Sequence, residues 1–202
     1  MSLSRKKSLA LNTSNRMATN SLVSDIRALI ETARGHVAHA VNAGMVSLYW
    51  DIGRRIREDI LKDKRAGYGE RIVATVSQQL TREYGCGFTK TAIFRMIRFT
   101  ERFSDRGIVA TLSQQLGWSH FVELITMEDP LKRNFYAEMC RLERWSIRTL
   151  RRKTGGMLYE RTALSKKPKK LAVLEIKKLR EGDKLSPDLV FRDPYFLDFL
   201  GL

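Results

Sequence analysis

Apolar residues recur at steps of three and four from Leu22 to Ile60, which places them along one side of a helix. The spacing predicts either one long helix or a helical hairpin, because Gly35, Gly44 and Gly53 could kink or interrupt it. An apolar stripe of this length has to pack on something, either the rest of this chain or a second copy of it.

A stretch of nine residues occurs twice in the chain. Ile72–Leu80 reads IVATVSQQL and Ile108–Leu116 reads IVATLSQQL. Each copy has helical spacing, then a break that contains glycine, and then a helix-capping residue, Thr89 or Ser119. This pattern predicts two helix–turn–helix-like units. No convincing run of the chain alternates apolar and polar residues as strands do, so we predict an all-α fold.

The charge of the chain favours a polyanionic partner. Lysine and arginine number 37 against 22 acidic residues, which gives a net charge of +15. A basic surplus of this size is typical of nucleic-acid-binding proteins, although charge also serves simply to keep a protein solvated. Cys86 and Cys140 lack metal-site spacing and are expected to be free thiols in a reducing, cytoplasmic setting. The uncharged stretch 35–50 is too short to span a membrane, so we expect no membrane partner.

Composition divides the chain into three expected parts. Residues 1–20 are rich in Ser, Asn, Arg and Lys without apolar periodicity, which predicts a disordered basic arm. Residues 21–164 are expected to form a helical DNA-binding domain. Residues 165–202 contain the run Lys166–Lys170 and many aromatic residues, and are expected to be a basic linker with an aromatic helical tail.

The helix predicted over 89–103 has the two faces that a groove-reading helix needs. Its apolar positions would seat it, and its basic positions would reach phosphates and base edges. The candidate DNA-binding residues on its outer face are Lys90, Thr91, Arg95, Arg98 and Arg102. Arg95 and Arg98 could reach guanine, while Lys90 and Arg102 would hold phosphates. An ordinary solvated helix face uses the same residue types, and that alternative stays open.

A second basic stripe could follow a phosphate backbone. Its members are Arg141, Arg144, Arg148, Arg151 and Arg152. They share one face if the helices on the two sides of Trp145 are nearly collinear. The alternative is that these arginines form helix-stabilising ion pairs with Glu138 and Glu143.

The second helix–turn–helix-like unit is a weaker candidate for contact with DNA. Glu123, Glu128 and Asp129 surround its second helix, and phosphate would repel them. We therefore interpret this unit as scaffold or subunit contact. Its aromatic residues, Trp118 and Phe121, are expected in the core, and His120 is expected to have a structural or capping role.

The sequence offers no convincing catalytic centre, and we expect no cofactor and no metal site. His36 and His39 lack a third ligand at useful spacing. Glu175-Ile176-Lys177 and Pro187-Asp188 are the pieces of a PD…(D/E)xK nuclease centre, but in reversed order and on a segment with a helical pattern. We therefore expect this chain not to be an enzyme.

Several motifs together resemble the YhcG-like family. They are Leu48–Gly53 (LYWDIG), Tyr68-Gly69 with the first nonapeptide, Gly87-Phe88 leading into Arg95-Met96, Leu116–His120 (LGWSH), Glu143–Ser146 (ERWS) and Leu185–Leu189 (LSPDL) with Asp193–Tyr195 (DPY). The resemblance covers about residues 22–202. It implies a bacterial protein directed at DNA, with a helical N-terminal domain followed by a PD-(D/E)XK nuclease-like domain.

The family's catalytic residues would lie beyond Leu202, so the resemblance implies a DNA-binding domain without the nuclease core. DNA, duplex or branched, is the expected partner, and a nuclease domain in trans is a further one. The alternative, from another functional class, is an oligomerisation or docking module in which the long helix self-associates.

Overall fold

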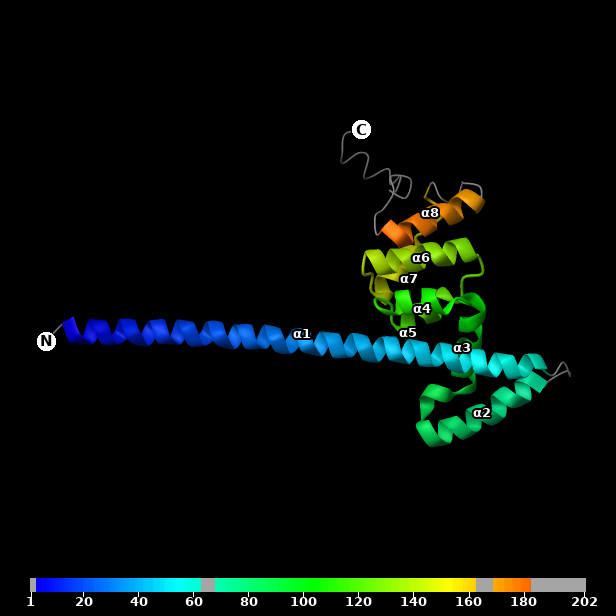
Figure 1. Ribbon diagram of the computed structural model, residues 1–202, viewed down its shortest axis with the longest axis horizontal. Helices are drawn as coiled ribbons and strands as arrows, with labels where there is room; N and C mark the ends of the chain where they lie inside the picture. The colour runs from blue at the N-terminus through cyan, green and yellow to red at the C-terminus, as the bar shows by residue number, and fades with distance from the viewer. Residues whose placement is uncertain (1–2, 63–67, 163–168, 183–202) are drawn as a thin grey trace. The chain divides into compact units, whose positions relative to one another are not determined.

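The computed structural model describes residues 3–62, 68–162 and 169–182 (Figure 1). They form helices and turns and contain no strand, which confirms the all-α prediction. The helices are α1 (Leu3–Lys62), α2 (Tyr68–Tyr84), the 3-10 helix η1 (Cys86–Phe88), α3 (Lys90–Arg102), α4 (Arg106–Ser113), α5 (Trp118–Leu124), α6 (Pro130–Leu142), α7 (Ile147–Gly155) and α8 (Lys169–Gly182).

The long helix is single and is not a hairpin. α1 continues through all three of its glycines, and it also includes residues 3–20, where we predicted a disordered arm. The physical reason is that no glycine or proline precedes Gly35, while Ala, Leu, Lys and Arg favour helix. Despite the length of α1, none of the described helices is apolar enough over a sufficient length to cross a membrane.

The chain divides into two compact units, Met1–Val41 and Asn42–Leu202. In the first unit, the large apolar side chains from Leu22 onward are exposed. In the second unit, the apolar stripe of α1 is buried at Val46, Trp50 and Ile56. Of the two expected arrangements, packing on the rest of the chain therefore applies only to buried positions in the later part of the stripe.

The core of the second unit is a cluster of aromatic and aliphatic side chains from α1 and from α3 to α8. Phe99 of α3 is fully buried, and its ring centroid lies 4.7 Å from that of Phe121 and 5.5 Å from that of Trp118. These contacts confirm the core positions predicted for Trp118 and Phe121. They also fix α3 against α5.

α3 packs very closely against α1 at Gly53. A Cβ atom at this position would lie 2.0 Å from the backbone oxygen of Met96 and 2.4 Å from its carbonyl carbon. Nearby, Nε1 of Trp50 donates a 2.7 Å hydrogen bond to the carbonyl oxygen of Phe103, directly after α3. Gly53 is therefore needed for a close helix contact and does not kink α1.

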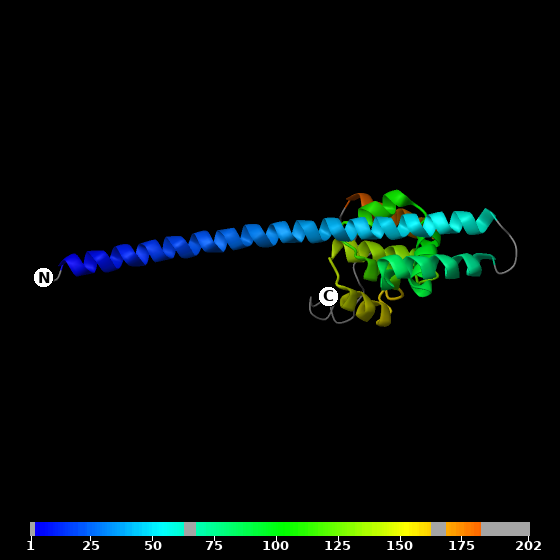
Figure 2. The same cartoon turned by 90° about the horizontal axis from the view of Figure 1, so that it is seen from below.

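The two copies of the nonapeptide fold differently. The first lies within α2, where Val73 packs with Ile56, Ile93 and Ile97 in a smaller cluster. Figure 2 shows α2 running beside the last turns of α1, to which Ile56 belongs. The second copy forms α4 only as far as Ser113 and then turns, with Leu116 buried in the main core.

α8 packs on α6 and contributes three buried residues to the main core, Ala172, Ile176 and Leu179. The buried carboxylate of Glu138 joins the two helices. Its Oε1 accepts a 2.6 Å hydrogen bond from Nε of Arg180, and its Oε2 accepts one of 2.8 Å from Nε of Arg141. The expected linker and tail at 165–202 therefore includes a core helix, while residues 163–168 and 183–202 lie outside the described residues.

Both cysteines are free thiols, as predicted. Cys86 is exposed and Cys140 is buried. Burial raises the pKa of the Cys140 thiol to about 12. At neutral pH this thiol is therefore protonated and chemically inert.

Candidate nucleic-acid interface

α3 begins where the sequence predicted it. The Thr89 hydroxyl accepts a 3.4 Å hydrogen bond from the backbone N–H of Ala92 and caps the helix. The buried side of α3 consists of Ile93, Met96, Ile97, Phe99 and Thr100. The exposed side consists of Lys90, Thr91, Phe94, Arg95 and Arg98. This arrangement confirms the two-faced helix, and we refer to Lys90, Thr91, Arg95 and Arg98 as the α3 face.

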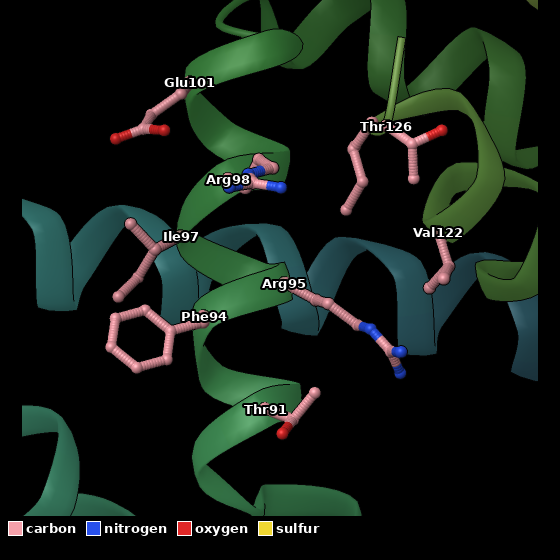
Figure 3. Close-up of a pocket in the computed structure, with 9 residues that line it drawn as sticks. Thr91, Phe94, Arg95, Ile97, Arg98, Glu101, Val122 and Thr126 are labelled. Carbon is pink, nitrogen blue, oxygen red and sulfur yellow. The ribbon is translucent and has the colours of Figure 1, made fainter.

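An open groove of about 560 Å³ lies between α3 and the end of α5 (Figure 3). Arg95 extends from α3 toward the wall that contains Val122 and Thr126. Neither Arg95 nor Arg98 forms an ion pair or hydrogen bond with any part of the chain that the structure describes. The groove therefore carries two guanidinium groups that are available to an anion, and its lining also includes the apolar side chains of Ile97 and Ile125.

Two other basic residues of α3 have neighbours within the protein. The ammonium group of Lys90 lies 5.9 Å from the centre of the Phe94 ring and remains exposed. Arg102 is half-buried, and its Nη1 donates a 3.4 Å hydrogen bond to the carbonyl oxygen of Glu128. The pKa of the buried Arg133 guanidinium is lowered, first by burial and second by the positive charge of Arg102. Arg102 is therefore less available to phosphate than the sequence pattern indicated.

The second basic stripe is not one surface. Arg141 has a side chain that is 11% exposed and is paired with the buried Glu138, so its predicted place on an outward stripe is wrong. The ion-pair alternative holds for this residue. Arg151 forms a 2.9 Å ion pair with Glu123 of α5. The remaining three are exposed and have no ion-pair partner among the described residues. We refer to them as the α7 arginines: Arg148 and Arg152 of α7, and Arg144 in the turn before it.

A reversing turn explains why the stripe is split. After α6 ends, the backbone N–H of Trp145 bonds back to the carbonyl oxygen of Cys140 at 3.2 Å, and Arg144 has a φ of 50°. A left-handed residue at this position ends a helix and redirects the chain. α7 then starts as predicted, with Ser146 accepting a hydrogen bond from the N–H of Thr149. Because the two helices are not collinear, sequence spacing did not keep the five arginines together.

His120 has the structural role that the sequence favoured. Its Nδ1 accepts a 3.2 Å hydrogen bond from the N–H of Gly117, and its Nε2 lies 2.9 Å from the carbonyl oxygen of Trp145. Since a carbonyl can only accept, Nε2 must carry the proton. Gly117 is therefore the N-cap of α5, and the expected cap, Ser119, is instead the second residue of the helix.

Replacing His120 with alanine should destabilise the second unit. The change removes the cap on Gly117 and the link to Trp145, which together are worth about 1–2 kcal/mol. Urea unfolding followed by circular dichroism measures this loss. Ser119→Ala is the matched control, because Ser119 is exposed and its side chain bonds to no described residue. Its effect should stay below about 0.5 kcal/mol, and equal losses in both variants would contradict the capping role.

Sequence reasoning missed the contacts that cross between elements. It did not find the second wall of the groove, which consists of Val122 of α5 and of Ile125 and Thr126, directly after that helix. It also did not find the buried Arg133, whose Nη1 donates a 2.9 Å hydrogen bond to the carbonyl oxygen of Met127. No local signal could have shown either feature, since each depends on which elements meet in space.

Comparison with protein families identifies the chain. The model of the DUF1016 N-terminal domain matches residues 25–161, from α1 to the turns after α7. This chain belongs to the DUF1016 N-terminal domain family. The region matched by this DUF1016 domain includes both the α3 face and the α7 arginines.

A related curated protein agrees with this assignment. The protein named "Putative nuclease YhcG" from Escherichia coli (strain K12) is 30% identical to this chain over an alignment of 204 residues. The alignment covers 86% of this chain and 54% of that protein. The DUF1016 chain thus spans about half the length of the relative it matches. The YhcG-like resemblance seen in the motifs is therefore confirmed. No solved structure matches the chain.

Proposed function

We propose that this chain is a DNA-binding helical domain of a nuclease-related protein, and that it holds duplex or branched DNA through the α3 face. The observation that carries the proposal is the state of Arg95 and Arg98. Both are exposed on a capped helix whose opposite side is buried, and neither has an acidic partner among the described residues. Guanidinium groups in such a position can bind phosphates or the acceptor atoms of guanine.

The surroundings of α3 support the same function. Of the residues that line the groove, Glu101 alone is acidic, and its carboxylate lies 3.9 Å from Nε of Arg57. The local charge therefore remains positive. The net charge of +15 would add long-range attraction for a polyanion.

The α7 arginines are proposed as a secondary contact. These three guanidinium groups can bind phosphates without first breaking an ion pair within the described chain: Arg144, Arg148 and Arg152. Arg151 would have to leave Glu123, and Arg141 would have to leave the buried Glu138. For this reason we assign Arg141, Arg151 and the half-buried Arg102 to supporting roles and not to direct contact.

Replacing both Arg95 and Arg98 with alanine tests the proposal. The double variant should bind duplex DNA at least about tenfold more weakly, because two charged contacts are lost. The plot of log affinity against log salt should also flatten by about two units, at ~0.9 per lost phosphate contact. Fluorescence anisotropy at several salt concentrations measures both quantities.

A matched control removes the same charge elsewhere. Arg54 and Arg55 lie on α1 and pair with Glu58 and Asp59 at 3.6 and 3.5 Å. Changing both to alanine lowers the net charge by the same amount but should leave the salt slope nearly unchanged. An unaltered slope in a folded Arg95/Arg98 variant, or equal losses in the two double variants, would defeat the assignment. The same titration with duplex, branched DNA and RNA identifies the preferred nucleic acid.

We also propose that the chain binds DNA without cutting it. The segment Glu175–Lys177 lies within helix α8, and Ile176 is buried in the core. A PD-(D/E)XK centre needs its acidic-x-Lys step on a strand, so this segment is a poor candidate for one. Pro187 and Asp188 lie outside the described residues. In this proposal catalysis belongs to a nuclease domain that accompanies the helical domain, and the complex works in the cytoplasm.

A further inference from the structure

The first unit has an apolar helix face that the described chain leaves exposed. Leu22 is 59% exposed, Leu29 is 71% and Val37 is 64%. Val23, Ile26 and Ile30 are also exposed. So many large apolar side chains on one stretch of helix are typical of a surface that another helix covers.

The exposed positions follow a heptad repeat from residue 23 to residue 40. The a positions are Val23, Ile30 and Val37, and the d positions are Ile26, Ala33 and Ala40. No charged residue occurs at either position. A repeat of seven keeps the seam facing a partner helix of the same period. β-branched residues at a also occur in parallel two-stranded coiled coils.

The other described helices of this chain are poor partners for this seam. The longest of them after α1 is α2, with 17 residues. Residues of α2 to α8 already fill the two buried clusters of the second unit. A second copy of the chain, in contrast, supplies a helix of matching length and matching period.

The arginines beside the seam indicate its orientation. Arg27 and Arg34 occupy e positions, and Leu22 and Leu29 occupy g positions. An antiparallel pair centred near residue 30 would place Arg27 of one helix beside Arg34 of the other, and like charges repel. In a parallel pair each arginine lies beside a leucine of the other helix, where its aliphatic stem can cover apolar surface.

We propose that residues 22–41 form a parallel two-stranded coiled coil with a second copy of this chain. The dimer presents two copies of the DNA-binding unit, so each molecule of DNA can be held at two places at once. Such bivalent binding raises the apparent affinity without any new contact with DNA. The coiled coil itself does not depend on DNA binding.

Light scattering coupled to size exclusion measures the first consequence. The full chain should have twice the mass of one copy at micromolar concentration. Ile30→Asp places a charge at an a position and should give a single copy. Ala28→Asp, on the outer f position of the same turn, should remain a dimer. A single copy of the unaltered chain, as expected if this helix packs elsewhere, or a dimer that survives Ile30→Asp, would overturn the proposal.

Disulfide trapping tests the parallel register. In a Cys86→Ser background, Ala33→Cys should form an interchain disulfide under mild oxidation, because d positions meet across a parallel seam. Ala38→Cys, at an outer b position, should remain largely unlinked. Non-reducing electrophoresis distinguishes the two. Failure of Ala33→Cys to link, or equal linking of both variants, would exclude the parallel arrangement.

Discussion

Gly53→Ala is expected to destabilise the second unit by about 3 kcal/mol or more, at the upper end of what overpacking costs. The added Cβ would lie 2.0 Å from the backbone oxygen of Met96, and backbone atoms cannot move aside as a flexible side chain can. α1 and α3 would have to separate. Their separation would disturb the buried contacts of Ile93 and Phe99 and would displace the α3 face.

Urea unfolding and DNA titration of the same preparation measure this effect. Gly35→Ala is the matched control, because it is the same substitution on the same helix and nothing lies within 4 Å of the added Cβ. Gly35→Ala should stabilise the helix by up to about 1 kcal/mol, since alanine is the better helix former. Gly53→Ala with unaltered stability would show that α3 does not pack on α1 at this point.

Glu138→Ala is expected to lower the free energy of unfolding by about 3–5 kcal/mol, which is the usual loss when one partner of a buried ion pair is removed. Glu138 is fully buried, and both of its oxygens accept hydrogen bonds from arginine, one on α6 and one on α8. Without the carboxylate, Arg180 and Arg141 would keep their charge but lose the anion they share. The packing of α8 on α6 should weaken first.

Hydrogen exchange of α8, combined with urea unfolding, measures this loss. Glu143→Ala is the matched control: Glu143 is exposed, and its side chain bonds to no described residue. It should change stability by less than about 0.5 kcal/mol. If both variants unfold at the same urea concentration, Glu138 does not hold the two helices together.

Prediction from sequence succeeded where a feature is local. The span of α3, its Thr89 cap and its apolar side follow from spacing and residue type within a few turns. The same reasoning failed at Arg141, where sequence spacing indicated an outward residue. The side chain of Arg141 lies instead against Glu138, and the turn at Arg144 separates it from the later arginines. Residue spacing within one helix contains no information about which helix lies opposite.

The sequence by itself determined the helical class, the family and the two faces of α3, because periodicity and capping act over a few residues. The tertiary structure alone decided which basic groups are available. Arg95 and Arg98 are available because no described acidic group lies within bonding distance, whereas Arg141 and Arg151 are paired with carboxylates. Availability depends on distances between residues far apart in the chain, and those distances are set when the helices pack.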